Sequence, residues 1–129
     1  MKYETVRRFA LALADTTEVP HHHFGSFRVK GRIFVTVPPD REHLHVFVSE
    51  PDREVALALH PGFTEKLLWG GKTLGLRVRL ATATPSVVKA LVTRAYETRV
   101  LKDAGPKRST RMQGVFGRAT ARGPKGEMA

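Results

Sequence analysis

Histidines are the residues of this chain whose type and spacing first suggest chemistry, since imidazole nitrogens bind transition metals. Three of the six are consecutive, His21–His23, and His43 and His45 alternate within an apolar segment. Adjacent residues of an extended chain point apart, so the run of three does not converge on one ion, and it is too short and too internal for a purification tag. His43 and His45 share a strand face, but Glu42 points away and cysteine is absent. We expect no metal and no other cofactor.

Signatures of catalysis are absent from the sequence. It holds no glycine-rich phosphate loop, no nucleophile elbow and no pair of acids at a spacing that serves acid–base chemistry. Glu50 and Asp52 belong to the start of a predicted helix, where acids stabilise the helix dipole. The lack of cysteine excludes a thiol nucleophile. We expect a protein that is not an enzyme.

Positive charge is the strongest feature of the composition. The chain carries 22 Lys and Arg against 12 Asp and Glu, a net charge of +10. A strong positive field attracts polyanions such as nucleic acid, acidic lipid surfaces or acidic proteins. An arginine-rich surface that serves only solubility would have the same composition, so charge alone leaves both interpretations open.

Length and hydropathy place the chain in a broad class. Its 129 residues suit one domain, which we expect over residues 1–104, followed by a basic, glycine-rich and disordered tail over residues 105–129. No apolar stretch approaches the about 20 residues that span a bilayer, and the N-terminal segment is too acidic for a secretory signal. We expect a cytoplasmic protein without a membrane partner.

Helical and strand periods divide residues 1–104 into elements. Apolar residues at helical spacing predict a helix over residues 3–14, which ends in the polar turn Asp15–Thr17. Residues 43–49 alternate and predict a strand, after which Ser49 can cap a helix that ends near His60. Thr84 and Pro85 are typical of the start of a last helix.

A first hairpin is predicted over residues 26–40, where strand-forming residues flank Lys30 and Gly31. A three-residue loop with a bulge at Gly31 would set Arg28 opposite Arg32. A two-residue loop, Lys30–Gly31, would instead put Arg32 on the face of Phe27 and Val29. We prefer the three-residue loop, because it keeps one face of the hairpin apolar.

A second hairpin is predicted over residues 63–80, where Gly70–Gly71 forms a two-residue turn that pairs Trp69 with Lys72. Alternation predicts an apolar face that packs on helices, formed by Phe63, Leu67, Trp69, Leu74, Leu76, Val78 and Leu80. The opposite face is basic. Together with the first hairpin and residues 43–49, it predicts one outward sheet face formed by Arg28, Arg32, Phe34, His43, His45, Phe47, Lys66, Arg77 and Arg79.

The segments "YETVRRFALALADTTE", "FGSFRVKGRIFVTV" and "VRLATATPSVVKALVTRAYE" resemble the MmcQ/YjbR family. The likeness runs from about residue 3 to about residue 108, and the helix-one pattern, the "SFRVKGRIF" hairpin and the "VRL" before the last helix carry it. The resemblance implies a two-layer α+β fold, similar to secretion chaperones, with a curved antiparallel sheet and helices on one side. We expect the order α-β-β-β-α-β-β-α.

The family is commonly described as DNA-binding, with its two hairpins acting as wings. The resemblance therefore implicates Arg28, Lys30, Arg32 and Lys72. Two features depart from the family pattern: leucines, Leu74 and Leu76, stand where relatives often carry an aromatic residue, and the basic tail is an addition.

We expect a non-enzymatic protein that binds nucleic acid, DNA rather than RNA, because cations neutralise phosphates and release counterions. The expected phosphate contacts are Arg28, Lys30, Arg32, Lys72, Arg77, Arg79, Lys107, Arg108 and Arg111. Phe34 and Phe47 are expected to support the face or to stack on bases. The alternative is an adaptor, in which the same face receives an acidic peptide or a second copy of the chain.

Overall fold

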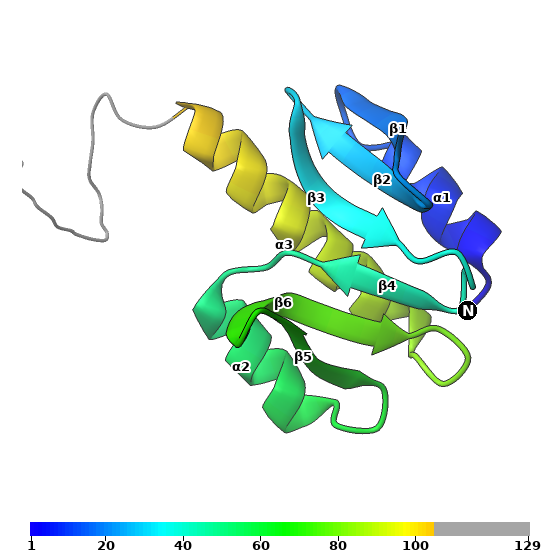
Figure 1. Ribbon diagram of the computed structural model, residues 1–129, viewed down its shortest axis with the longest axis vertical. Coiled ribbons are helices and arrows are strands. Elements are labelled where there is room, and N and C mark those ends of the chain that lie inside the picture. The colour runs from blue at the N-terminus through cyan, green and yellow to red at the C-terminus, as the bar shows by residue number, and fades with distance from the viewer. Residues whose placement is uncertain (105–129) are drawn as a thin grey trace, which may run out of the picture. The chain divides into compact units, whose positions relative to one another are not determined.

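The computed structural model describes residues 1–104, of which Met1–Arg99 form one compact unit. Its elements are α1 (Tyr3–Leu11), β1 (Thr16–His21), β2 (Phe24–Val29), β3 (Arg32–Val37), β4 (His43–Val46), α2 (Glu50–Leu59), β5 (Thr64–Trp69), β6 (Lys72–Arg79) and α3 (Pro85–Ala104). The strands form one antiparallel sheet in the order β1-β2-β3-β4-β6-β5. The α+β class is confirmed, with one strand more than predicted (Figure 1).

The additional strand is β1, in the segment where the sequence predicted only a polar turn. It pairs with β2 along its whole length, from Thr16 opposite Val29 to His21 opposite Phe24. Only Thr16 and Val19 are partly buried, so this edge strand lacks the apolar alternation by which strands are recognised. The histidine run therefore lies at a hairpin, with His22 in the turn at a φ of 59°.

The β2–β3 hairpin has the two-residue loop that we had placed second, so the preferred register was wrong. Val29 pairs with Arg32, and the turn residues Lys30 and Gly31 have φ angles of 53° and 78°. Two successive positive φ angles define a type I′ turn, whose twist matches that of the strands. Arg28 then lies opposite Ile33, not opposite Arg32.

A bulge between Phe27 and Arg28 restores an apolar face despite this register. Phe27 pairs with Val35 and Arg28 with Ile33, which leaves Phe34 as an extra residue of β3. Phe34 and Val35 are consecutive, yet both are fully buried. The bulge therefore turns Phe34 toward the helices, whereas alternation had assigned it to the outward face.

The three helices cover the same face of the sheet as Phe34. The Phe34 ring lies edge-to-face with Tyr96 of α3, at a centroid distance of 5.6 Å, and α3 passes behind β3 and β4 in Figure 1. On β5, the Thr64 hydroxyl donates 2.7 Å to the His60 carbonyl that follows α2. On β1, Glu18 accepts from Tyr3 of α1 at 3.1 Å. The core lies between these helices and the sheet.

The helix starts match the capping signals of the sequence. The Ser49 hydroxyl accepts a hydrogen bond of 3.3 Å from the Asp52 backbone NH, which makes Ser49 the N-cap of α2. The Thr84 carbonyl accepts from the amides of Val87 and Val88, so α3 begins where Pro85 predicted. Among residues 1–104, no helix combines the length and apolar character needed to cross a membrane.

Candidate nucleic-acid interface

The face of the sheet opposite the helices, called the open face here, carries a row of paired residues across five strands. Strand pairing sets the row from β2 to β5 as Ser26, Thr36, His45, Arg77 and Glu65. Directly opposed residues of an antiparallel pair project to the same side, so these five side chains share the face. A second, shorter row joins His43 to Arg79, and Arg28 lies opposite Ile33. The side chains of Arg28, Arg77 and Arg79 therefore lie on the open face, as alternation along their strands predicted.

On the β2 side of the open face, the small Ser26 side chain lies beneath the side chain of Arg28. Ser26 is fully buried, and its hydroxyl donates to the Val19 carbonyl of the edge strand. The Arg28 Nε donates to the same hydroxyl at 3.3 Å. This contact holds the Nε of Arg28 against the sheet. Arg28 is half-buried, so part of it remains exposed to solvent.

Arg77 lies at the centre of the charged half of the open face. Its Nε is 3.7 Å from the Glu65 Oε2, too far for a hydrogen bond, and this buried nitrogen has no hydrogen-bond partner among the described residues. Buried N–H groups in folded proteins are nearly always hydrogen-bonded. The Arg77 side chain as a whole is 39% exposed, so the rest of its guanidinium can face an anion, with Glu65 as a weak competitor.

His45 stands between Arg77 and Phe24 on the open face. Burial lowers the pKa of His45, and the charges of Arg77 and then His43 lower it further, against a small opposing effect of Asp40. The Phe24 ring lies 5.9 Å from the His45 ring between centroids. His45 is therefore neutral at pH 7 and contributes little to the positive charge of the face.

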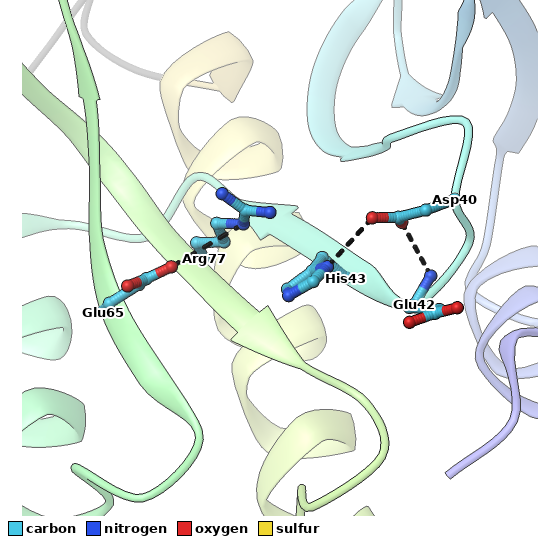
Figure 2. Close-up of polar contacts among 5 residues, drawn as sticks. All are labelled: Asp40, Glu42, His43, Glu65 and Arg77. Carbon is cyan, nitrogen blue, oxygen red and sulfur yellow. Dashed lines mark hydrogen bonds and ion pairs between the residues drawn. The ribbon is translucent and has the colours of Figure 1, made fainter.

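His43 is held by the turn that precedes β4, as Figure 2 shows. Its Nδ1 lies 3.1 Å from the Asp40 Oδ2, and the other Asp40 oxygen accepts 2.8 Å from the Glu42 backbone NH. The bond from Glu42 is the main cause that lowers the pKa of Asp40, and His43 adds to it. Asp40 thus orients the His43 ring at the edge of the open face, beside Arg79.

The two phenylalanines expected to stack on bases lie elsewhere. Phe34 is fully buried against α3, so that prediction is wrong. Phe47 follows the end of β4, and its ring lies 6.0 Å from the Arg99 guanidinium of α3. Lys66 was also assigned to the wrong face, since it pairs with the core residue Leu76. The Phe24 ring, which the sequence did not single out, lies beside His45 on the open face.

The turn residues Lys30 and Lys72 are both exposed and lie at the same end of the sheet. β3 starts just after Lys30, and its antiparallel partner β4 ends at the same end of the sheet with Val46. β6 is antiparallel to β4, so β6 starts at this end too, with Lys72. Arg32 is exposed but pairs with Val29, on the face of the core residue Phe27, so it does not join the open face. Lys107, Arg108 and Arg111 lie outside the described residues.

The tip of the β5–β6 hairpin exposes apolar side chains that the sequence had assigned to the core. Trp69 pairs with Lys72 as predicted, but a register shift between Leu67 and Leu68 sets Leu67 opposite Gly75 rather than Leu74. Trp69 is 77% exposed and Leu74 is 45% exposed. The apolar alternation of this hairpin predicted one core face, but the register shift puts Leu67 and Trp69 on the side of the sheet opposite Leu76.

Two cavities lie at the sheet, one near the β1–β2 turn and one on the open face. The first, about 500 Å³, lies near the β1–β2 turn, where the Glu18 carboxylate accepts from Tyr3 and from Arg7. A smaller one of about 90 Å³ is lined by His43, Glu65, Arg77 and Arg79 and belongs to the open face. Within residues 1–104 no group of three metal-ligating side chains converges.

Comparison with known proteins identifies the family of the chain. No curated protein matches the chain. The model of the YjbR family matches residues 11–98, from the end of α1 through β1 and the rest of the sheet to the fourth turn of α3. The match covers more than half of the chain and includes every strand of the open face, and the chain therefore belongs to the YjbR family.

Proposed function

We propose that this protein binds DNA without catalysing a reaction, and that the open face and the two hairpin tips contact the phosphates. The observation that carries the proposal is the charge of the open face. Arg28, Arg77 and Arg79 supply three guanidinium groups, and Glu65, the carboxylate paired with this row, is 3.7 Å from the Arg77 Nε. Membership of a family described as DNA-binding supports the same proposal.

The spacing of these cations suits a polymer of phosphates better than one small anion. Arg28 on β2 and Arg77 on β6 are separated by β3 and β4, which amounts to about 14 Å at the usual distance between strands. Charges spread over such a distance neutralise several phosphates of a backbone and release their counterions. Lys30 and Lys72 extend this track at one end of the sheet, where wings could follow a groove.

The residues beyond the described part of the chain add to the proposal. Lys107, Arg108 and Arg111 would strengthen binding through charge, without reading the sequence of the nucleic acid. We propose a cytoplasmic location, which is consistent with the absence of cysteine.

A second candidate function is an adaptor that binds an acidic peptide or a second copy of the chain. The exposed apolar side chains of the β5–β6 hairpin favour it, because such side chains often mark protein interfaces. Phosphate binding weakens steeply with salt, whereas apolar contacts between proteins hardly change, so the two functions respond differently to ionic strength.

Fluorescence anisotropy of labelled duplex and single-stranded DNA across a salt series tests the proposal on the full chain. The test variant is Arg28→Gln, Arg77→Gln, Arg79→Gln. The matched control is Arg8→Gln, Lys89→Gln, Arg94→Gln, which removes the same charge from exposed positions on the helices. Both retain residues 105–129, so any difference between them arises from the face that was changed.

We expect the open-face variant to lose at least about tenfold in affinity for DNA. The slope of log affinity against log salt concentration should become shallower by about two to three. The helix variant should bind within about threefold of the original chain. Equal losses in the two variants would mean that net charge, not the open face, drives binding. No binding to either DNA at low salt would overturn the proposed function.

A further inference from the structure

The tip of the β5–β6 hairpin presents a tryptophan at the end of the basic open face. Gly70 and Gly71 have φ angles of 58° and 80°, which define a type I′ turn and set Trp69 directly opposite Lys72. A turn of this type holds the two side chains on one face of the hairpin, with the indole beside a cation.

Alternation along β5 identifies that face. Thr64 bonds the end of α2, so it points toward the helices. β5 is regular, because the extra residue at the register shift, Leu74, belongs to β6. Glu65, Leu67 and Trp69 therefore point to the open face. The indole therefore lies on the same face as Arg77 and Glu65, four residues beyond Glu65 along β5 and on the side of Lys72.

The exposure of Trp69 has no structural explanation within the domain. Its side chain is 77% exposed, the largest value among the exposed large apolar residues, and no ring or cation contact joins it to another described residue. Indole is a large apolar ring that proteins usually bury, at least in part. An exposed ring beside a cationic track is instead the arrangement by which proteins hold unpaired nucleotides, whose bases stack on the ring while phosphates follow the cations.

We propose that Trp69 stacks on an unpaired base of single-stranded nucleic acid, while Lys72 and the open face hold the adjoining phosphates. The inference rests on the proposed function and narrows it, since a paired base inside a duplex offers no free face to the indole. The stacking role first expected of Phe34 and Phe47 is thereby assigned to Trp69, whose ring is exposed to solvent.

A second copy of this chain is a less suitable occupant of the tip. The apolar side chains there are few, and Leu68 points to the opposite face from Trp69. A stable protein interface buries about 800 Å² on each partner around an apolar centre. Lys72, which stands directly opposite Trp69, would place a charge at that centre.

The chain contains a single tryptophan, so its fluorescence reports on this position alone. The full chain is titrated with an oligothymidylate of about twelve nucleotides, with a deoxyribose-phosphate oligomer of the same length that lacks bases, and with a duplex. We expect the oligothymidylate to quench the indole emission. The oligomer without bases should bind but leave the emission unchanged.

Affinity of Trp69 variants for labelled oligothymidylate, measured by anisotropy, gives a second readout. Trp69→Ala should weaken binding by roughly fivefold to 100-fold, the range of one base–aromatic stack, and Trp69→Phe should restore most of the loss. Binding of the duplex should change by less than about twofold. Leu59→Ala is the matched control, since Leu59 is also exposed but lies on α2. Circular dichroism checks that the variants fold.

The outcomes separate the inference from the proposed function. Oligothymidylate binding with unchanged emission and unchanged affinity in Trp69→Ala would overturn the inference and leave the proposed function standing. Failure of all three oligomers to bind at low salt would overturn both. A dimer in sedimentation that Trp69→Ala dissociates would also overturn the inference, because the tip would then be an interface between copies.

Discussion

His45 and Arg77 lie directly opposite each other on β4 and β6, with both side chains on the open face. The Cβ atoms of such a pair are about 5 Å apart, so the imidazole lies within the field of the guanidinium. Burial is the main cause that lowers the pKa of His45, and Arg77 is the second. The charge of the open face at pH 7 is therefore carried by arginine, and His45 remains available as a proton acceptor.

Affinity for DNA should rise as the pH falls below 7, because a bound phosphate offsets the positive charge of Arg77 and raises the pKa of His45 in the complex. The complex then takes up a proton that the free protein does not hold, so acid favours binding. His43 and Asp40 also face His45, and their charges lower and raise its pKa, respectively. Anisotropy titrations from pH 7.5 to about 5.5 should show this rise, and His45→Gln should flatten it. His60→Gln, at the end of α2, is the control that should keep the slope.

The Arg77→Gln substitution should raise the pKa of His45 in the free protein. Removal of the guanidinium charge favours the protonated imidazole, but burial remains, so the pKa should stay below its ordinary value of 6.5. Titration of the histidine ring signals by NMR measures the shift directly. Arg79→Gln is the matched variant, since Arg79 lies opposite His43. An equal rise of the His45 pKa in both variants would contradict the role assigned to Arg77.

The sequence predicted the open face where strands run without interruption and failed where a bulge intervenes. β4 and the second half of β6 alternate regularly, so His43, His45, Arg77 and Arg79 were assigned to the correct face. Each bulge adds one residue to a strand and reverses the assignment beyond it. Phe34 turned inward at one bulge, and Leu74 became the extra residue at the other. No glycine or proline stands beside Phe34 to mark the first bulge, whereas Gly75, directly after Leu74, is a signal for the second.

The register shift of the β5–β6 hairpin was a second limit on prediction from the sequence. A regular two-residue hairpin puts Trp69 on the face of Leu76, but the extra residue Leu74 puts it on the opposite face. Trp69 was thus assigned to the core with Leu76, although Leu76 is fully buried and Trp69 is exposed. Edge strand β1 was missed for another reason, because few of its side chains are covered at all.

Phe34 should matter for stability and not for nucleic-acid contact. Phe34→Ala removes a fully buried ring that packs on Tyr96 and should lower the free energy of unfolding by about 3–5 kcal/mol. Phe34→Leu keeps most of the volume and should retain both the fold and the affinity for DNA. Urea denaturation and anisotropy measure the two effects. Loss of affinity in a folded Phe34→Leu protein would revive the stacking role that its burial excludes.

Gly75 determines how closely β4 and β6 can approach, and thereby the distance between His45 and Arg77, which are paired across these strands. A Cβ at this position would lie 2.4 Å from the Val46 carbonyl oxygen, and backbone cannot yield as a flexible side chain does. We expect Gly75→Ala to lower the free energy of unfolding by about 2–3 kcal/mol, the range for an overpacked core.

The matched control for Gly75 is Gly62→Ala, since Gly62 has open space around it and no positive φ. That variant should change the free energy of unfolding by less than about 1 kcal/mol. If Gly75→Ala folds but separates β4 from β6, the pKa of His45 should rise, because greater exposure and a more distant Arg77 both favour the protonated ring. NMR titration of the variant measures this, and an unchanged His45 pKa in a destabilised protein would show that the strain is relieved elsewhere in the sheet.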